Sequence, residues 1–166
     1  MITGSFASSA HGVVRGSRDI DIVIAATAEQ LQTFVAQFPS DRFYADEYDA
    51  LESLKYNSQF NVIDFSSPWK VDLIFLKDRP FSRVEFERRL PHVVQGVRVF
   101  IATPEDIVIA KLEWAKMGES ERQIDDAAGV IATQGANLDR AYVERWVQEL
   151  ELEKQWQLAR ERAGRP

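Results

Sequence analysis

Residues 19–24 read Asp-Ile-Asp-Ile-Val-Ile, and this alternation of acidic and branched apolar side chains most restricts what the chain can form. A β-strand projects successive side chains from opposite faces, so Asp19 and Asp21 share one face while the isoleucines share the other. Two carboxylates on one face repel each other, and a divalent cation bound between them removes that repulsion. Mg²⁺ prefers oxygen ligands of this kind, together with substrate phosphates. The alternative is a half-exposed strand whose aspartates face water.

Two other stretches carry residues suited to phosphate and metal. Gly4 and Ser5 offer a backbone that a ligand can approach closely and a small hydroxyl, both of which suit phosphate oxygens. In the strand predicted over residues 69–76, Asp72 interrupts a largely apolar run and shares its face with Lys70. A lone aspartate in a strand can also be a charge at a sheet edge.

The order of these residues resembles the signature of the nucleotidyltransferase superfamily, which has the DNA polymerase beta-like fold. The resemblance rests on Gly4-Ser5, a gap of thirteen residues, the pair Asp19 and Asp21, and Asp72 in a later strand. More loosely, the helices after residue 104 resemble those of AbiE-type toxin nucleotidyltransferases and related uncharacterised bacterial proteins. The resemblance implies an α/β (α+β) fold, with a small mixed twisted sheet, helices packed on it and a helical C-terminal part.

The same resemblance implies metal-dependent transfer of a nucleoside monophosphate from an NTP, such as ATP, to an acceptor hydroxyl. Asp19, Asp21 and Asp72 would hold two Mg²⁺ ions, with Mn²⁺ as an alternative, and Asp72 would also help to deprotonate the acceptor. Gly4 and Ser5 would steady the triphosphate. Such phosphoryl chemistry depends mainly on charge neutralisation and in-line positioning.

Lys111 falls near the middle of the apolar arc of the helix predicted over residues 104–117. A lysine there either extends to water or pairs with an acidic side chain or an anionic ligand. By resemblance to the AbiE-like proteins, Lys111 contacts nucleotide phosphate, and Asp126 of the following helix faces the same cleft. The alternatives for the second helix are a surface ion pair between Arg122 and Asp126, and Asp125 as the relevant carboxylate.

Arg15 and Arg18 flank the acidic pair on its N-terminal side. They are predicted either to contact the triphosphate or to balance the charge of Asp19 in a solvated loop. His11 has no identified partner in the sequence, so a structural role is expected for it.

The hydrophobic pattern of the rest of the sequence predicts further helices and strands. Besides the elements above, the expected elements are a helix over 28–38 capped by Thr27, a helix over 46–56, a strand over 60–65, a helix over 82–89 that begins in a capping box at Ser82, a hairpin of 93–94 with 97–101, a helix over 119–133, and a helical tail from 139 that ends in a frayed charged stretch.

The composition limits the classes of protein to which this chain can belong. A chain of 166 residues that is 45% hydrophobic can bury one sizeable core, so residues 1–101 and 102–166 are expected to pack as one unit. The absence of cysteine excludes disulfides and thiolate zinc sites. There is no run of eighteen apolar residues, so a cytoplasmic protein without a membrane segment is expected. The net charge of −6 argues against extended non-specific binding of DNA.

The main alternative to an enzyme is a non-catalytic binding protein of the same fold, such as an antitoxin-like partner, because fold does not determine function. The complete set of three aspartates favours the enzyme. The acceptor is open among tRNA, a protein hydroxyl and a small molecule such as an aminoglycoside. The choice of NTP, the partner of a toxin–antitoxin pair and an oligomeric state are open as well.

Overall fold

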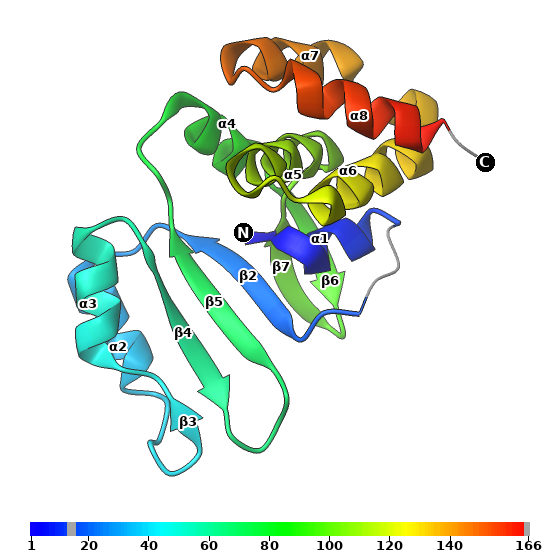
Figure 1. The fold of residues 1–166 in the computed structure, drawn as a ribbon. Coiled ribbons are helices and arrows are strands. Elements are labelled where there is room, and N and C mark those ends of the chain that lie inside the picture. The colour runs from blue at the N-terminus through cyan, green and yellow to red at the C-terminus, as the bar shows by residue number, and fades with distance from the viewer. Residues whose placement is uncertain (13–15, 165–166) are drawn as a thin grey trace.

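The computed structural model describes residues 1–12 and 16–164, which form a seven-stranded mixed sheet and eight α-helices (Figure 1). The strands are β1 (Ile2–Thr3), β2 (Asp19–Ile24), β3 (Phe43–Tyr44), β4 (Gln59–Asp64), β5 (Lys70–Phe75), β6 (Leu90–Val94) and β7 (Val97–Ile101). The helices are α1 (Gly4–Ala10), α2 (Ala28–Val35), α3 (Glu47–Lys55), α4 (Pro80–Arg88), α5 (Pro104–Gly118), α6 (Glu121–Gln134), α7 (Arg140–Glu149) and α8 (Glu153–Ala163), with a 3₁₀ turn at Gly135–Asn137. The α/β (α+β) class is therefore confirmed.

The sheet has the strand order β3-β4-β5-β2-β1-β7-β6. β2 runs parallel to β5 and β1 runs parallel to β7, whereas the other neighbours are antiparallel. The register of β2 and β5 pairs Asp19 with Lys70 and Asp21 with Asp72. Residues paired across adjacent strands project from the same face, so these four side chains share one face of the sheet.

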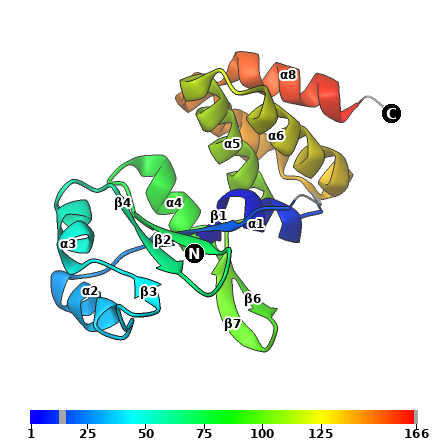
Figure 2. The same ribbon diagram turned by 60° about the horizontal axis from the view of Figure 1, so that its bottom comes forward.

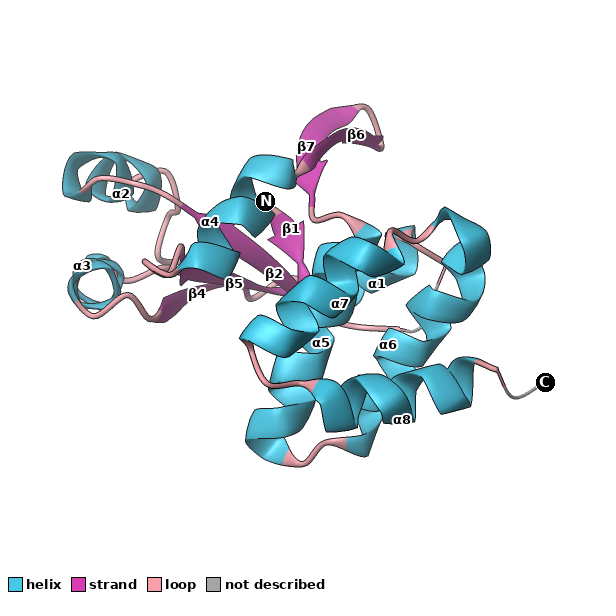
Figure 3. Cartoon of the chain, turned by 90° about the horizontal axis from the view of Figure 1, so that it is seen from above, coloured by secondary structure: helices cyan, strands magenta, loops and turns pink. Residues whose placement is uncertain are grey.

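The opposite face of β4, β5 and β2 is apolar and packs on α2 and α3, which lie together beside these strands in Figures 1 and 3. Thr27 caps α2 as predicted, and it forms a capping box with Gln30. The buried residues of this core are Leu31, Val35, Ala50, Phe60, Val62, Leu73 and Phe75. The alternation predicted for the strand 69–76 is thus confirmed, because Leu73 and Phe75 lie in this core while Ile74 lines the opposite face with Asp72.

A second core joins the helices α5–α8 to the other end of the sheet, and Figure 2 shows these helices grouped away from α2 and α3. It includes Ile2 of β1, Ala7 of α1 and Ile101 of β7 together with apolar residues of all four helices. Residues on both sides of position 101 therefore contribute to one core. No helix within the described residues is long and apolar enough to cross a membrane.

The helix predicted to begin at Ser82 begins instead at Pro80, with Arg79 as the residue before the first turn. Proline is favoured at this position because its missing N–H would have no helical partner there. The hydroxyl of Ser82 accepts a hydrogen bond of 2.8 Å from Nε of Arg79, and the Glu85 side chain is buried. The predicted capping box is therefore wrong.

The C-terminal tail is two packed helices, and the prediction of a frayed end is wrong for the described residues. α7 and α8 are separated by a short break in which Glu151 has a positive φ of 56°. Leu152 and Trp156 are buried in the second core. The tail is charged on its surface, yet its apolar side fastens it to α6. The helix predicted over 28–38 is also shorter, since α2 ends at Val35.

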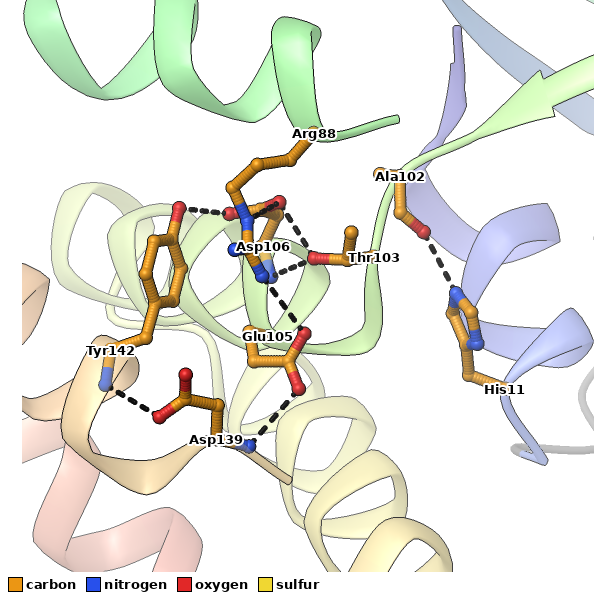
Figure 4. A network of polar contacts seen from close by, with 8 residues as sticks. All are labelled: His11, Arg88, Ala102, Thr103, Glu105, Asp106, Asp139 and Tyr142. Atoms are coloured by element: carbon orange, nitrogen blue, oxygen red, sulfur yellow. Dashed lines mark hydrogen bonds and ion pairs between the residues drawn. The ribbon is translucent and has the colours of Figure 1, made fainter. Parts of the chain in front are cut away.

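A buried polar network joins α4, α5 and α7 (Figure 4). Asp106 is fully buried, and its carboxylate accepts hydrogen bonds from Thr103 Oγ1 at 2.6 Å, Tyr142 OH at 2.6 Å and Arg88 Nε at 3.2 Å. Burial and the hydrogen bond to Asp106 raise the pKa of Tyr142. Every oxygen of Asp106 has a donor, so the network is a satisfied structural element rather than an open site.

His11 has the structural role expected for it. At the end of α1, its Nε2 lies 2.8 Å from the carbonyl oxygen of Ala102, to which it donates (Figure 4). Gly12, next to it, has a positive φ of 105°, and a Cβ there would lie within 2.9 Å of Thr133 Oγ1 on α6. The end of α1 is thereby fastened both to the entry of α5 and to α6.

The buried carboxyl group of Glu85 on α4 predicts that the stability of the protein depends on pH. Burial, and next the charge of Asp106, raise the pKa of Glu85 from 4.5 to about 8. Between these two values the folded state keeps a proton that the unfolded state has released, so stability falls as pH rises through this window. A shift of this size corresponds to roughly 3–5 kcal/mol. Glu85→Gln, which is neutral at every pH, should remove that loss.

The measurement is urea unfolding of both proteins at about pH 5 and about pH 8.5. Glu87→Gln, at an exposed position of the same helix, is the matched control and should retain the wild-type pH dependence. Equal losses of stability in wild type and Glu85→Gln would show that Glu85 is not responsible.

Candidate functional site

The polar face of the sheet carries a row of side chains that crosses four strands. Asp21 of β2 pairs with Asp72 of β5, Thr3 of β1 pairs with Asp21, and Asn61 of β4 pairs with Asp72. Since paired residues share a face, these four polar side chains lie side by side opposite the apolar layer of α2 and α3. The two aspartates predicted from separate stretches of sequence are therefore neighbours.

A pocket of about 300 Å³ opens over this row, between the sheet, α1 and α5. It is lined by Thr3, Gly4, Ser5, Asp21, Gln59, Asp72, Ile74, Ile107, Ala110, Lys111, Trp114 and Gln123. Five of the residues predicted to form the site are among them: Gly4, Ser5, Asp21, Asp72 and Lys111. A larger hollow of about 720 Å³ lies between α6 and α8, and none of the predicted site residues lines it.

Gly4 brings the backbone of α1 directly against Asp21. Its φ is +62°, and a Cβ at this position would overlap Oδ2 of Asp21 and lie 2.8 Å from Cγ. Only glycine combines this backbone conformation with so close an approach. The choice of glycine in the predicted Gly4-Ser5 pair is thus explained by the carboxylate it faces, and Ser5 follows at the same edge of the pocket.

The two paired carboxylates differ in their surroundings. Asp72 is 6% exposed, and its Oδ1 has no hydrogen-bond partner among the described residues. The pKa of Asp21 is raised, first by burial and then by the negative charge of Asp72, while Lys111 acts in the opposite direction. A buried carboxylate oxygen without a donor, beside a second carboxylate whose ionisation is opposed, is a donor set that fits a divalent cation.

Asp19 lies at the edge of the site rather than in the pocket. Its side chain is 55% exposed, and Lys70 extends between it and Asp72. Nζ of Lys70 is 2.9 Å from Oδ2 of Asp72 and 3.9 Å from Oδ1 of Asp19. Within residues 1–12 and 16–164, no three carboxylate or imidazole side chains come together as a metal-binding group. The three aspartates share a face, as expected, but only Asp21 and Asp72 line the pocket.

Lys111 and Asp126 form a buried ion pair at the back of the pocket. Nζ of Lys111 lies 2.8 Å from Oδ2 of Asp126, and the two residues are 4% and 5% exposed. Lys111 therefore does not extend to water. Asp126 is the carboxylate that turns inward, whereas Asp125 bonds Arg162 at the surface at 2.6 Å. The alternative of a surface ion pair between Arg122 and Asp126 is wrong, because Asp126 is buried.

Arg18, one of the two arginines predicted to flank the acidic pair, is not among the described residues that line the pocket. Arg15 lies outside the described residues. Arg18 is exposed at the entry of β2, where its carbonyl oxygen accepts a 3.0 Å hydrogen bond from the backbone N–H of Lys70.

Several residues of the pocket, and of the sheet face beside it, were not predicted to take part in the site. Lys70 and Asn61 carried a signal, because strand alternation places them on the face of Asp72. Gln123 and Trp114 carried none that separates them from ordinary helix residues. Oδ1 of Asn61 and Oε1 of Gln123 are buried and lack hydrogen-bond partners among the described residues, and Gln123 thereby offers the pocket an acceptor beyond the carboxylates. Trp114 is 56% exposed at the rim.

No protein-family model matches the chain, and no curated protein sequence matches it either. A solved structure is similar: an antigenic nucleotidyltransferase-like protein from Paracoccidioides brasiliensis, with a TM-score of 0.50 and 16% sequence identity. The match covers 95% of this chain and 83% of that one. The fold is nucleotidyltransferase-like. This agrees with the family resemblance of the sequence at the level of the fold, while the likeness to AbiE-type proteins stays a prediction.

In this nucleotidyltransferase-like fold, the contact between Gly4 and Asp21 predicts the effect of one added methyl group. Gly4→Ala should lower stability for two reasons. Alanine is strained at the positive φ of this position, and its Cβ would displace the Asp21 carboxylate, which should cost about 1–3 kcal/mol. Gly96→Ala is the matched control, because Gly96 also has a positive φ, of 81°, but no described atom within 4 Å of its Cβ position. Urea unfolding should show the larger loss for Gly4→Ala, and equal losses would contradict the close approach.

The buried pair of Lys111 and Asp126 makes a second prediction. Lys111→Met leaves Asp126 buried without its cation and should cost about 3–5 kcal/mol of unfolding free energy. The double variant Lys111→Met, Asp126→Leu should recover most of this loss, because no uncompensated charge remains. Asp125→Asn, in the exposed pair with Arg162, should cost less than about 1 kcal/mol. Additive losses for Lys111 and Asp126 would show that the two are not coupled.

Proposed function

We propose that the protein is a metal-dependent nucleotidyltransferase that transfers a nucleoside monophosphate from an NTP to an acceptor hydroxyl. The observation that carries the proposal is the register pair of Asp21 and Asp72 inside a pocket that also contains Gly4, Ser5 and Lys111. Carboxylates, a close backbone approach and a cation are the groups that phosphoryl transfer requires in one place.

The nucleotide is bound by residues from both parts of the chain. Gly4 and Ser5 present the backbone and a hydroxyl to the phosphates at the start of α1, and Lys111 brings positive charge from α5. Because Asp126 already holds one side of the Lys111 ammonium, the lysine is oriented before the nucleotide arrives. Arg18, and Arg15 outside the described residues, are proposed to contact the outer phosphates.

Asp21 and Asp72 are the proposed metal ligands within the pocket, and Asp19 adds negative charge at its edge. The chemistry that bound Mg²⁺ or Mn²⁺ supplies is neutralisation of charge on the reacting phosphate. A cation at this place would favour the ionised form of Asp21, whose pKa burial and the charge of Asp72 otherwise raise.

Asp72 is also the proposed acceptor of the proton. Its carboxylate accepts the hydroxyl proton of the acceptor as the acceptor oxygen attacks the α-phosphorus of the NTP. A new P–O bond forms to the acceptor, the bond between the α-phosphorus and the bridging oxygen breaks, and pyrophosphate leaves. The proton then passes from Asp72 to solvent.

The acceptor classes are tRNA, a protein hydroxyl and a small molecule such as an aminoglycoside. Transfer to tRNA or to an essential protein would make the chain the toxin of a toxin–antitoxin pair, in line with the resemblance to AbiE-type proteins. The net charge of −6 favours an acceptor that is bound at a small local site over one that is bound along an extended nucleic-acid backbone. Label from α-³²P-ATP appearing on one of the three classes would identify the acceptor.

Nucleotide and metal should stabilise the folded protein together. At a concentration of MgATP about 100 times its dissociation constant, the melting temperature should rise by roughly 5–10 °C, and chelation of Mg²⁺ by EDTA should reverse this. Asp21→Asn should abolish the shift, while the ligand-free variant should be as stable as wild type or more so, because repulsion from Asp72 is relieved.

Asp41→Asn is the control for this thermal-shift measurement. Asp41 is exposed in the turn before β3, so its loss should leave the MgATP shift intact. A wild-type melting temperature that does not respond to millimolar MgATP would instead favour the non-catalytic binding protein.

A further inference from the structure

Lys70 occupies the space in which a cation shared by two of the three aspartates would lie. It is the residue paired with Asp19 in the register of β2 and β5, and it stands two positions before Asp72 on the same strand. Its Nζ therefore reaches both carboxylates, at 2.9 Å from Asp72 and 3.9 Å from Asp19. Strand geometry, rather than a chance rotamer of a surface side chain, brings the ammonium to this place.

The pair with Asp72 differs from an ordinary surface ion pair. The side chain of Asp72 is 9% exposed and that of Lys70 is 36% exposed, so the carboxylate is largely shielded from water while the ammonium closes its outer side. The two oxygens of Asp72 consequently have different roles. Oδ2 is held by Lys70, whereas Oδ1 is buried and has no partner among the described residues.

The balance of charge in the site also assigns one position to Lys70 and one to a divalent cation. Lys111 pairs directly with Asp126, whereas Lys70 makes direct ion pairs with two of the three aspartates of the sheet. Lys70 offsets one of those three negative charges, and the remaining two equal the charge of a single divalent cation. A second divalent ion between Asp19 and Asp72 would have to lie beside the Lys70 ammonium, and like charges at such a distance repel strongly.

We propose that Lys70 replaces one of the two metal ions expected from the sequence, so that the site holds a single divalent ion through Asp21 and Asp72. The Lys70 ammonium supplies the second positive charge and keeps Asp19 out of the metal coordination. This proposal rests on the proposed function, because it concerns how the same carboxylates take up metal.

The test is the number of Mn²⁺ ions bound per chain. The full chain is titrated with Mn²⁺ without nucleotide, because a triphosphate binds Mn²⁺ by itself, and bound ions are counted from the loss of the free Mn²⁺ signal in electron paramagnetic resonance. Two ions roughly 3.5–4 Å apart also give a spin-coupled spectrum, which a single ion does not. Wild type should bind one ion with an uncoupled spectrum.

The variants separate charge from packing. Lys70→Met keeps much of the aliphatic side chain and removes the ammonium, so it should bind two ions and give the coupled spectrum. Lys70→Arg keeps the charge and should bind one. Lys154→Met, at an exposed position of α8 away from the sheet, removes the same charge elsewhere and should also bind one. Circular dichroism confirms that each variant is folded, and the wild-type count depends on no variant.

The outcomes distinguish the two proposals. Two coupled ions in wild type would overturn the role of Lys70 while leaving the metal-dependent function in place. A single ion in folded Lys70→Met would also overturn it, because the ammonium would then not be what excludes the second ion. No bound ion in wild type would overturn both this inference and the proposed function.

Discussion

The parallel register of β2 and β5 is the constraint on which the rest of the site depends. It places Asp21 directly beside Asp72, although the two are separated by fifty positions of sequence, and it does so on the face that α2 and α3 do not cover. A slip of one residue would turn Asp72 into the apolar layer and expose the leucine beside it, so burial of that layer holds the register. The apolar side of the sheet thus determines the geometry of the polar side.

Two groups of buried charges in this protein have opposite characters. Around Asp106, a threonine, a tyrosine and an arginine donate to the carboxylate, and the group fastens α4, α5 and α7 together. Around Asp72, one oxygen has a lysine and the other lacks a donor among the described residues. Buried polar groups that serve structure alone are normally satisfied. Asp106 is thus satisfied by protein donors alone, whereas Asp72 keeps one oxygen without a described donor, in line with the proposed metal site.

The pocket requires both parts of the chain. Its floor comes from the sheet, but α5 forms the opposite wall and contributes Lys111, which α6 orients through Asp126. The core shared by β1, α1, β7 and the four last helices holds these walls in place. A sheet without the helical part would present its carboxylates to open solvent, where electrostatic contacts to phosphate are weak.

The sequence by itself determined the strand faces, the pairing of glycine with serine before the first long strand, and the class of fold, because these follow from local periodicity and from a motif with fixed spacing. It also indicated that the Lys111 ammonium would either reach water or pair with an anion, and the structure shows the pair with Asp126. Only the tertiary structure decided which residues meet. The choice of Asp126 over Asp125, the collision that forbids a side chain at position 4, and the insertion of Lys70 between Asp19 and Asp72 depend on contacts between elements distant in sequence. Periodicity assigns a residue to a face, but packing and register decide what lies opposite it.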